Sequence, residues 1–270
     1  ESGGMINDPI ILKLGEEQFW LSVADSDVLL WAKGLATGYG FDVTVQEPDV
    51  SPFAIQGPKA EALVAKVLGE EIRKIRFFRF AEIDFKGHKM FMARSGWSKQ
   101  GGFEIYLNDS SLGLDLWDTF WEAGQEFNVG PGCPNLIERI EGGLFSYGND
   151  MGYEHNPFEA GLKKYTNLDA DIEFLGRPAL EKALNSVVER MLRGVKIEGD
   201  DCPACMKDWD LSGLSGEPAG AISSAAYSPR LKCGVAFAMV NKDFWDTGTE
   251  VTVHTSDGDR KGTVTDVPFI

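Results

Sequence analysis

The glycine-rich segment 94–105 (RSGWSKQGGFEI) holds residues that could bind a small ligand. Its three glycines permit a ligand to approach the backbone closely. Glu104 lies at the start of an expected strand between two apolar neighbours, where a carboxylate is poorly solvated unless it accepts hydrogen bonds. Two interpretations remain open. Glu104 binds a ligand, or it belongs to a turn and pairs with an arginine such as Arg94 or Arg139.

Asp8 is the second candidate, because Asn7-Asp8-Pro9 leads directly into an apolar run. A carboxylate at the mouth of a buried strand can orient a ligand or take part in acid–base chemistry. Asp before Pro is also an ordinary turn signal. From the residue types alone, the turn is the favoured interpretation.

Cys202 and Cys205 form a CxxC motif, which serves redox chemistry or half of a zinc site in other proteins. A zinc site needs two further ligands, and the sequence has no second CxxC and no closely spaced histidine pair, so no metal is expected. The sequence contains no GxGxxG after a strand and no GxxxxGK[ST], which argues against nucleotide cofactors. Surface or structural roles are expected for the three histidines, which are His88, His155 and His254.

The composition is that of a globular protein, with 270 residues, 43% hydrophobic and 25% charged. The formal net charge of −16 argues against nucleic acids and anionic membranes as partners, since both attract basic proteins. Four cysteines are too few for a disulfide scaffold at this length. We therefore expect a cytoplasmic protein with reduced thiols. The first residue is Glu1, as expected of a fragment or a processed product.

The first two thirds of the chain mix strands and helices without a regular βαβ repeat, which favours the α+β class. The expected strands are residues 5–12, 18–23, 42–46, 53–56, 72–93 with a break at Lys86-Gly87, and 103–107. The expected helices are one capped by Ser26 with its apolar face on residues 28–35, one over 59–68 after Pro58, and two over 111–127 and 135–146.

The chain becomes rich in strands from about Pro178. After a helix over residues 178–190, short apolar runs recur with Gly and Asp between them, which is typical of a small all-β unit. The runs are residues 192–197, 219–224, 234–240, 249–254 and 261–267.

Taken in order, six segments resemble the folate-dependent aminomethyltransferase family, which comprises the T-protein of the glycine cleavage system and its relatives. They are residues 3–8 (GGMIND), 55–58 (IQGP), 96–105 (GWSKQGGFEI), 139–144 with 147–148 (RIEGGL and YG), 227–229 (YSP) and 268–270 (PFI). The resemblance spans essentially the whole chain. It begins in mid-family, so about a hundred N-terminal residues of a typical member are expected to be missing.

Within the family, the likeness is greatest to the branch that demethylates dimethylsulfoniopropionate. That branch is similar at residues 24–27, 96–102, 132–139 and 266–270. Three departures from the T-protein argue against aminomethyl transfer. Asn7 replaces one of two paired acidic residues, Ala24 replaces an asparagine, and Asn135 replaces an arginine.

The resemblance implies transfer of a methyl group from the sulfonium of dimethylsulfoniopropionate to N5 of tetrahydrofolate. Glu104 matches the family glutamate that hydrogen-bonds the pterin ring, and Asp8 matches the aspartate beside the folate, where it is the implied catalytic group. Ser22 and Tyr165 are further implied folate contacts, with Lys163 or Lys164 near the glutamate tail.

Trp97 and Phe103 offer aromatic faces that could hold a sulfonium by cation–π attraction. Core packing is the alternative role for both rings, and for Phe103 the two roles have equal weight.

The implied fold is a three-lobed disc with two ferredoxin-like α+β lobes and a C-terminal β-barrel, here lacking part of the first lobe. The folate-binding region covers residues 1–176 and the barrel domain covers residues 177–270. The alternatives are an aminomethyltransferase of glycine cleavage and a folate-binding relative without turnover.

Overall fold

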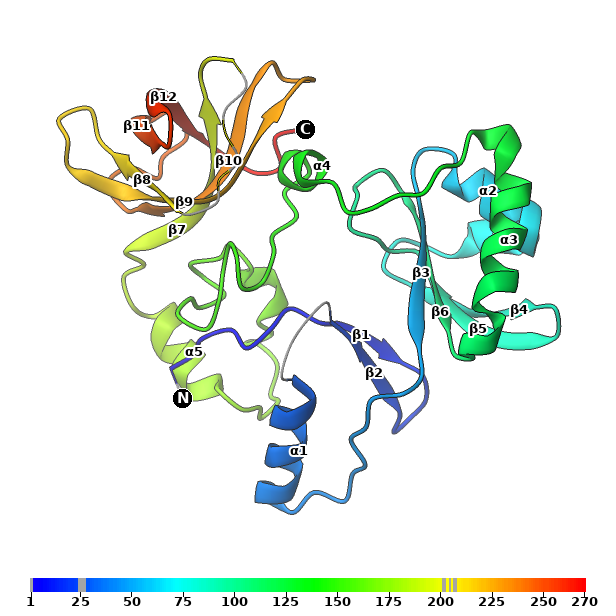
Figure 1. The fold of residues 1–270 in the computed structure, drawn as a ribbon. Coiled ribbons are helices and arrows are strands. Elements are labelled where there is room, and N and C mark those ends of the chain that lie inside the picture. The colour runs from blue at the N-terminus through cyan, green and yellow to red at the C-terminus, as the bar shows by residue number, and fades with distance from the viewer. Residues whose placement is uncertain (1, 24–27, 201–202, 204, 206–207) are drawn as a thin grey trace. The chain divides into compact units, whose positions relative to one another are not determined.

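The computed structural model describes residues 2–23, 28–200, 203, 205 and 208–270. The expected helix cap Ser26 and the motif at 24–27 lie outside these residues. The chain divides into two compact units. We call residues 11–135 the sheet unit, and residues 1–10 together with 136–270 the barrel unit (Figure 1).

A four-stranded antiparallel sheet organises the sheet unit, with strand order β3-β6-β5-β4. The strands are β3 (Ser51–Gln56), β4 (Phe80–Phe85), β5 (His88–Ala93) and β6 (Gly102–Leu107). Lys86 and Gly87 both have positive φ, 54° and 87°, which is the backbone of a tight turn that matches strand twist. The expected break at these two residues is therefore the hairpin turn between β4 and β5.

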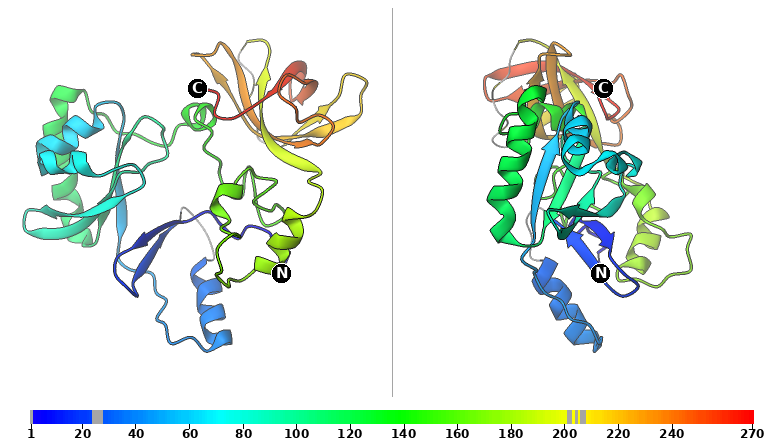
Figure 2. Two further views of the ribbon diagram at one scale, coloured as in Figure 1. Left: turned by 180° about the vertical axis from the view of Figure 1, so that it is seen from behind. Right: turned by 90° about the vertical axis from the view of Figure 1, so that its right-hand side faces the viewer.

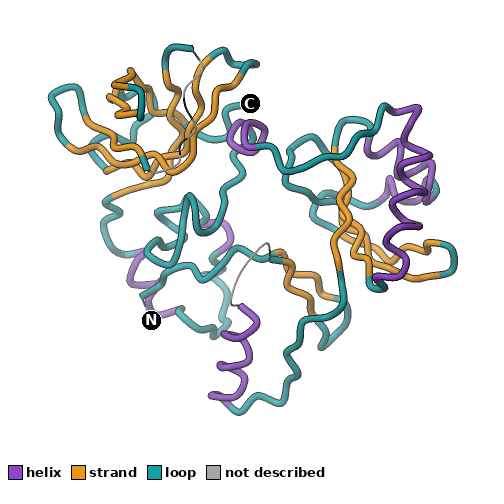
Figure 3. Tube along the Cα trace, in the orientation of Figure 1, coloured by secondary structure: helices purple, strands orange, loops and turns teal. Residues whose placement is uncertain are grey.

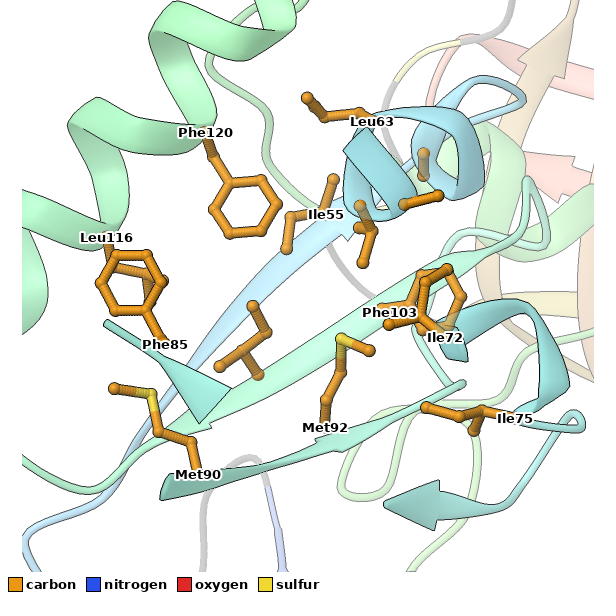
Figure 4. Close-up of a cluster of buried hydrophobic side chains, with 14 of the residues drawn as sticks. Ile55, Leu63, Ile72, Ile75, Phe85, Met90, Met92, Phe103, Leu116 and Phe120 are labelled. Atoms are coloured by element: carbon orange, nitrogen blue, oxygen red, sulfur yellow. The ribbon is translucent and has the colours of Figure 1, made fainter. Parts of the chain in front are cut away.

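Helices α2 (Ala60–Leu68) and α3 (Gly113–Gly124) cover one face of this sheet (Figure 2). Short 3-10 turns accompany them at Glu70–Lys74, Ser110–Leu112 and Gln125–Phe127. The core between helices and sheet is apolar throughout, with Phe103 and Ile105 fully buried and Leu116 and Phe120 packing from α3 (Figure 4). Because successive side chains of a strand alternate between faces, Glu104 and Tyr106 lie on the other face of the sheet.

A hairpin of β1 (Ile10–Lys13) and β2 (Phe19–Ser22) packs on that second face. The ring of Trp20 lies 5.5 Å from Phe91 and 6.1 Å from Tyr106, centroid to centroid. Helix α1 (Val28–Tyr39) follows and contains no buried residue. Its expected apolar face therefore makes no core within the described residues.

A closed six-stranded antiparallel barrel dominates the barrel unit (Figure 3). Its strand order is β10-β7-β12-β11-β8-β9. The strands are β7 (Arg190–Ile197), β8 (Trp209–Ser212), β9 (Pro218–Ser228), β10 (Cys233–Asn241), β11 (Glu250–Thr255) and β12 (Gly258–Thr265). Helices α4 (Leu136–Glu141) and α5 (Arg177–Leu184) and a 3-10 turn at Lys163–Tyr165 precede the barrel.

Buried polar side chains join α4 to the barrel. Arg139 donates to Asp150 at 2.5 Å and to the hydroxyl of Ser224 on β9 at 2.7 Å. The side chains of Arg139 and Asp150 are 5% and 0% exposed. Ser228, also on β9, donates to Glu141 at 2.5 Å. These buried charges are paired and hydrogen-bonded, as burial requires.

Three segments expected to be strands are not. Residues 5–9 are irregular, so the first strand begins at Ile10 and not at Met5. Residues 42–46 form a loop with Val43 60% exposed, because no neighbouring strand within the described residues pairs with them. Residues 72–79 form the end of a 3-10 turn and a connection, so the first strand of the 72–93 stretch begins only at Phe80.

Two expected helices are too long. The helix over 135–146 ends at Glu141, since Gly143 takes a left-handed φ of 70° and its N–H bonds to the carbonyl of Ile140. The helix over 178–190 ends at Leu184, where Asn185 and Ser186 turn their side chains onto the last carbonyls. The four-residue strand β8 was missed, because so short a run carries little periodicity.

Candidate functional site

The carboxylate of Glu104 is half-buried on β6, and its hydrogen-bond partner is a serine. Ser95, which is buried, donates its hydroxyl to Oε2 of Glu104 at 2.5 Å. Within the described part of the chain, no group donates to Oε1. The arginine partners considered from the sequence bond elsewhere, Arg94 to Glu61 and Arg139 to Asp150. Glu104 therefore has one oxygen held in place and one that can accept from a ligand.

Trp97 lies in the glycine-rich loop that connects β5 to β6, and it is 40% exposed. Gln56, the last residue of β3, donates to the carbonyls of Ser95 and Phe103 on the two sides of this loop. The sheet unit thus places a partly exposed indole and a half-buried carboxylate on one short stretch of chain.

Ser22 reaches the same face of the sheet as Glu104. It hydrogen-bonds the hydroxyl of Tyr106, which lowers the pKa of that phenol, while burial, the larger effect, and the charge of Glu104 raise it. The net pKa of Tyr106 is above its ordinary value, so the group is a neutral donor and acceptor. Tyr106 was not selected from the sequence, although its spacing of two from Glu104 puts both on one face.

Phe103 is fully buried in the core between the sheet and helices α2 and α3. The guanidinium of Arg94 lies 5.3 Å from the centre of its ring. Of the two roles left open from the sequence, the structure supports core packing. A substrate contact from Phe103 needs a ring face that burial has closed.

In the barrel unit, Asp8 lies on an irregular segment that a few contacts hold. The N–H of Met5 donates to the carbonyl of His155 at 3.0 Å, and the hydroxyl of Tyr147 donates to the carbonyl of Met5 at 2.8 Å. Gly4 has no room for a side chain, because a Cβ would lie 1.9 Å from the carbonyl oxygen of Tyr153. Two of the segments that carry the family resemblance, residues 3–8 and 147–148, are therefore in contact.

Asp8 is exposed to solvent, and the surrounding protein nevertheless desolvates its carboxyl in part. Burial by surrounding protein raises its pKa, and a backbone hydrogen bond partly offsets that rise. Its own N–H bonds to the Asn7 side chain at 2.8 Å. The negative charge of Asp8 in turn contributes to the raised pKa of Tyr147, after burial and Glu154. Asp8 is therefore a better proton acceptor than an ordinary aspartate once it is ionised.

Tyr165 ends a 3-10 turn in the barrel unit and is 69% exposed. The ammonium of Lys164 lies 4.8 Å from the centre of its ring. Tyr165 therefore offers an accessible aromatic face with a cation on it.

Cys205 and His254 belong to the barrel unit. Cys202 is outside the described residues, and the thiol of Cys205 lies 3.9 Å from the carbonyl oxygen of Ile222. His254, on the barrel, bonds Ser212 at 2.8 Å and Asp259 at 2.7 Å. Among the described residues, no three His, Cys, Asp or Glu side chains gather as metal ligands. The sheet unit also has a cavity of about 300 Å³, and none of the predicted site residues lines it.

Comparison with known families assigns both parts of the chain. Residues 1–170 match the GCVT N-terminal domain, and residues 190–270 match the glycine cleavage T-protein C-terminal barrel domain. The chain belongs to the glycine cleavage T-protein family. The family resemblance seen in the sequence and the expected α+β fold with a C-terminal barrel are confirmed.

Three members of the family show how similar this chain is to known proteins. Dimethylsulfoniopropionate demethylase DmdA of Ruegeria pomeroyi is 47% identical over 97% of this chain and 71% of its own length. An aminomethyltransferase of Synechococcus is 31% identical over 100% of this chain and 74% of its own. The crystal structure of aminomethyltransferase T from Bartonella henselae aligns with a TM-score of 0.82 at 24% identity, covering 100% of this chain and 73% of its own.

No helix in the described ranges is long and apolar enough to cross a membrane.

Proposed function

We propose that this protein is a tetrahydrofolate-dependent methyltransferase that converts dimethylsulfoniopropionate to methylthiopropionate and 5-methyltetrahydrofolate. The observation that carries the proposal is the 47% identity over 97% of the chain to a dimethylsulfoniopropionate demethylase. Seven aminomethyltransferases among the relatives of this chain are 26–31% identical to it.

Catalysis of this methyl transfer requires mainly that the two substrates are aligned. The carbon–sulfur bond breaks with its electron pair going to sulfur, the N5 lone pair forms the new bond to carbon, and the N5 proton leaves. A sulfonium is already a good leaving group, so holding N5, methyl and sulfur in line supplies most of the acceleration. The residues needed are therefore folate ligands, a cation-holding surface and one proton acceptor.

Glu104 is proposed to bind the pterin ring. The N3–H and 2-amino group of a pterin present two donors on one edge, which suits a carboxylate. The hydrogen bond from Ser95 fixes Oε2, and Oε1 has no donor within the described residues. Ser22 and Tyr165 are proposed as further folate contacts, Ser22 through its place beside Tyr106 and Tyr165 through its exposed ring.

Asp8 is proposed as the catalytic residue that orients the folate and accepts the N5 proton, which its raised pKa favours. Trp97 is proposed to hold the sulfonium. An indole is the best aromatic partner for a cation, with a contribution of about 1–2 kcal/mol when water is excluded.

We propose further that the folate-binding region comprises residues 1–176 and the barrel domain residues 177–270. The family matches at 1–170 and 190–270 support this division. A cytoplasmic location is proposed on the free thiols of Cys133 and Cys233. The net charge of −16 supports the absence of nucleic acid as a partner.

The test is mass spectrometry of a reaction between dimethylsulfoniopropionate and tetrahydrofolate with the 270-residue chain. We expect methylthiopropionate and 5-methyltetrahydrofolate to appear in equal amounts. Methylene transfer with release of ammonia, from an aminomethylated donor, would identify an aminomethyltransferase instead. Folate binding without turnover would identify a non-catalytic relative.

A further inference from the structure

We propose that Gln56 is a positioning residue that fastens the loop carrying Trp97 to the strand carrying Glu104. The proposal rests on the function proposed above, in which these two residues bind the two substrates. Gln56 ends β3 and pairs in register with Gly102, the first residue of β6. Its side chain therefore starts next to both ends of the glycine-rich loop.

The amide nitrogen of Gln56 bridges those two ends. Nε2 donates to the carbonyl of Ser95 at 3.0 Å and to the carbonyl of Phe103 at 3.3 Å. Ser95 lies near the start of the loop and Phe103 follows its end, 39 and 47 residues from Gln56 in sequence. One amide group thus closes the loop at its base.

The amide oxygen of Gln56 holds the middle of the loop. Oε1 accepts from the hydroxyl of Ser98 at 2.8 Å, and the same Ser98 oxygen accepts from the N–H of Gln100 at 3.1 Å. Trp97 lies between Ser95 and Ser98, so Gln56 bonds a residue on each side of the indole, through the backbone carbonyl of Ser95 and the hydroxyl of Ser98.

Two glycines leave the space that this amide fills. A Cβ on Gly96 would lie 2.1 Å from Oε1 of Gln56. A Cβ on Gly102 would lie 2.8 Å from Nε2 and 2.2 Å from the carbonyl oxygen of Ile55. Their φ angles are 145° and 146°, which other residues rarely adopt. The two glycines permit the loop conformation and leave room for the side-chain amide of Gln56.

Ser95 connects this arrangement to the folate side. Its carbonyl is held by Gln56, and its hydroxyl donates to Oε2 of Glu104. Loss of the Ser95 hydroxyl affects Glu104 alone. Loss of the Gln56 amide affects both Glu104 and Trp97. This asymmetry separates a positioning role from general support of the fold.

The experiment measures KM for each substrate in Gln56→Leu and Ser95→Ala. Gln56→Leu keeps most of the side-chain volume and removes three hydrogen bonds. We expect both KM values to rise and kcat/KM to fall about 100-fold, the size of effect that small misplacements produce. In Ser95→Ala we expect KM for tetrahydrofolate to rise about tenfold with KM for dimethylsulfoniopropionate unchanged. Ser95→Thr keeps the hydroxyl and should restore folate binding.

A double-mutant cycle tests the link to the loop. Ser98→Ala alone should raise KM for dimethylsulfoniopropionate a few-fold. Adding it to Gln56→Leu should have a smaller effect, because the bond between Ser98 and Gln56 is already lost and only the bond from the N–H of Gln100 remains to be removed. Gln56→Glu keeps the acceptor and loses both donors, so it should resemble Gln56→Leu. Gln125→Leu is the matched control, since the side-chain amide of Gln125 donates to the carbonyl of Trp121 at the exposed end of α3 and to no other group among the described residues.

Hydrogen exchange of residues 96–101 without substrates gives a readout independent of turnover. Faster exchange in Gln56→Leu than in Gln125→Leu is expected. Unchanged exchange and unchanged KM values in a folded Gln56→Leu would overturn the inference and leave the proposed function standing. A wild type that transfers no methyl group would overturn the function, and exchange would still decide whether Gln56 holds the loop. If Gln56→Leu does not fold, Ser95→Ala and Ser98→Ala are combined instead. Additive effects of these two substitutions on KM, together with unchanged hydrogen exchange in Ser98→Ala, would contradict a connection through Gln56.

Discussion

The two proposed catalytic-site carboxylates are held in different ways. Glu104 lies on a central strand, where the ladder to β3 and β5 and the hydroxyl of Ser95 set its direction. Asp8 lies on an irregular segment whose position depends on Met5 contacts with Tyr147 and His155, about 140 to 150 residues away in sequence. A group on a regular element inherits its geometry from many cooperating bonds. A group on an irregular segment depends on a few, so single substitutions should affect Asp8 more sharply.

The largest effect is expected for Asp150, a buried residue close in sequence to Tyr147, which hydrogen-bonds the segment that carries Asp8. Asp150, three residues beyond Tyr147, pairs with Arg139 inside the barrel unit. Asp150→Ala removes the carboxylate that balances the buried positive charge of Arg139 and should lower the free energy of unfolding by about 3–5 kcal/mol. Urea denaturation measures this. In Asp118→Ala, which changes an exposed residue, the free energy of unfolding should stay within about 0.5 kcal/mol of the wild-type value. Equal losses in the two variants would contradict a stabilising role of the Arg139–Asp150 pair.

Asp8→Asn should reduce kcat about 100-fold, since it removes the proposed proton acceptor. It should not destabilise the protein at neutral pH. Folding raises the pKa of Asp8, so its ionised form is disfavoured in the folded state, and any stability linked to this group is lost as the pH rises through the folded pKa. Steady-state kinetics and thermal denaturation separate the two effects. A variant that loses activity only by unfolding would refute the assignment.

Glu104→Gln should weaken tetrahydrofolate binding about 10- to 100-fold, because a hydrogen bond to a charged acceptor contributes about 1.5–3 kcal/mol. Isothermal titration calorimetry measures the affinity. Glu82→Gln on β4, which breaks an exposed pair with Lys89, is the control and should bind normally. Unchanged affinity in a folded Glu104→Gln would remove this residue from the folate site.

Tyr147→Phe should lower kcat about fivefold with folate affinity unchanged. It removes only the hydrogen bond from the phenol to the Met5 carbonyl, a contribution of about 1 kcal/mol. Kinetics beside folate titration would show the split. Equal effects on kcat and on folate affinity would mean that the irregular segment around Met5 contributes to folate binding as well as holding Asp8.

The smallest expected effect is in the pH profile. Since the pKa of Asp8 is raised by burial, the acid limb of kcat/KM should lie above the pKa of an ordinary aspartate. The limb should disappear in Asp8→Asn and remain in Glu104→Gln. An acid limb shared by wild type and Asp8→Asn would assign it to another group.

Local patterns predicted most elements of the fold. The alternation in residues 103–107 predicted β6, and the apolar spacing of residues 59–68 predicted α2, because both depend on neighbours in sequence. The same patterns failed at residues 42–46, where a strand-like run has no partner strand. They also failed at residues 142–146 and 185–190, where backbone turns end the two helices.

By itself, the sequence determined the family, the two candidate carboxylates and the glycine-rich loop between strands, since these are properties of residue type and order. Tertiary structure decided which groups touch. It buried Phe103 in the core, placed Tyr106 beside Ser22 and gave Ser95 to Glu104. It also put Gln56 across a loop that begins 39 residues later. Such contacts depend on long-range packing, and periodicity along a chain carries no record of which distant segment will provide the partner.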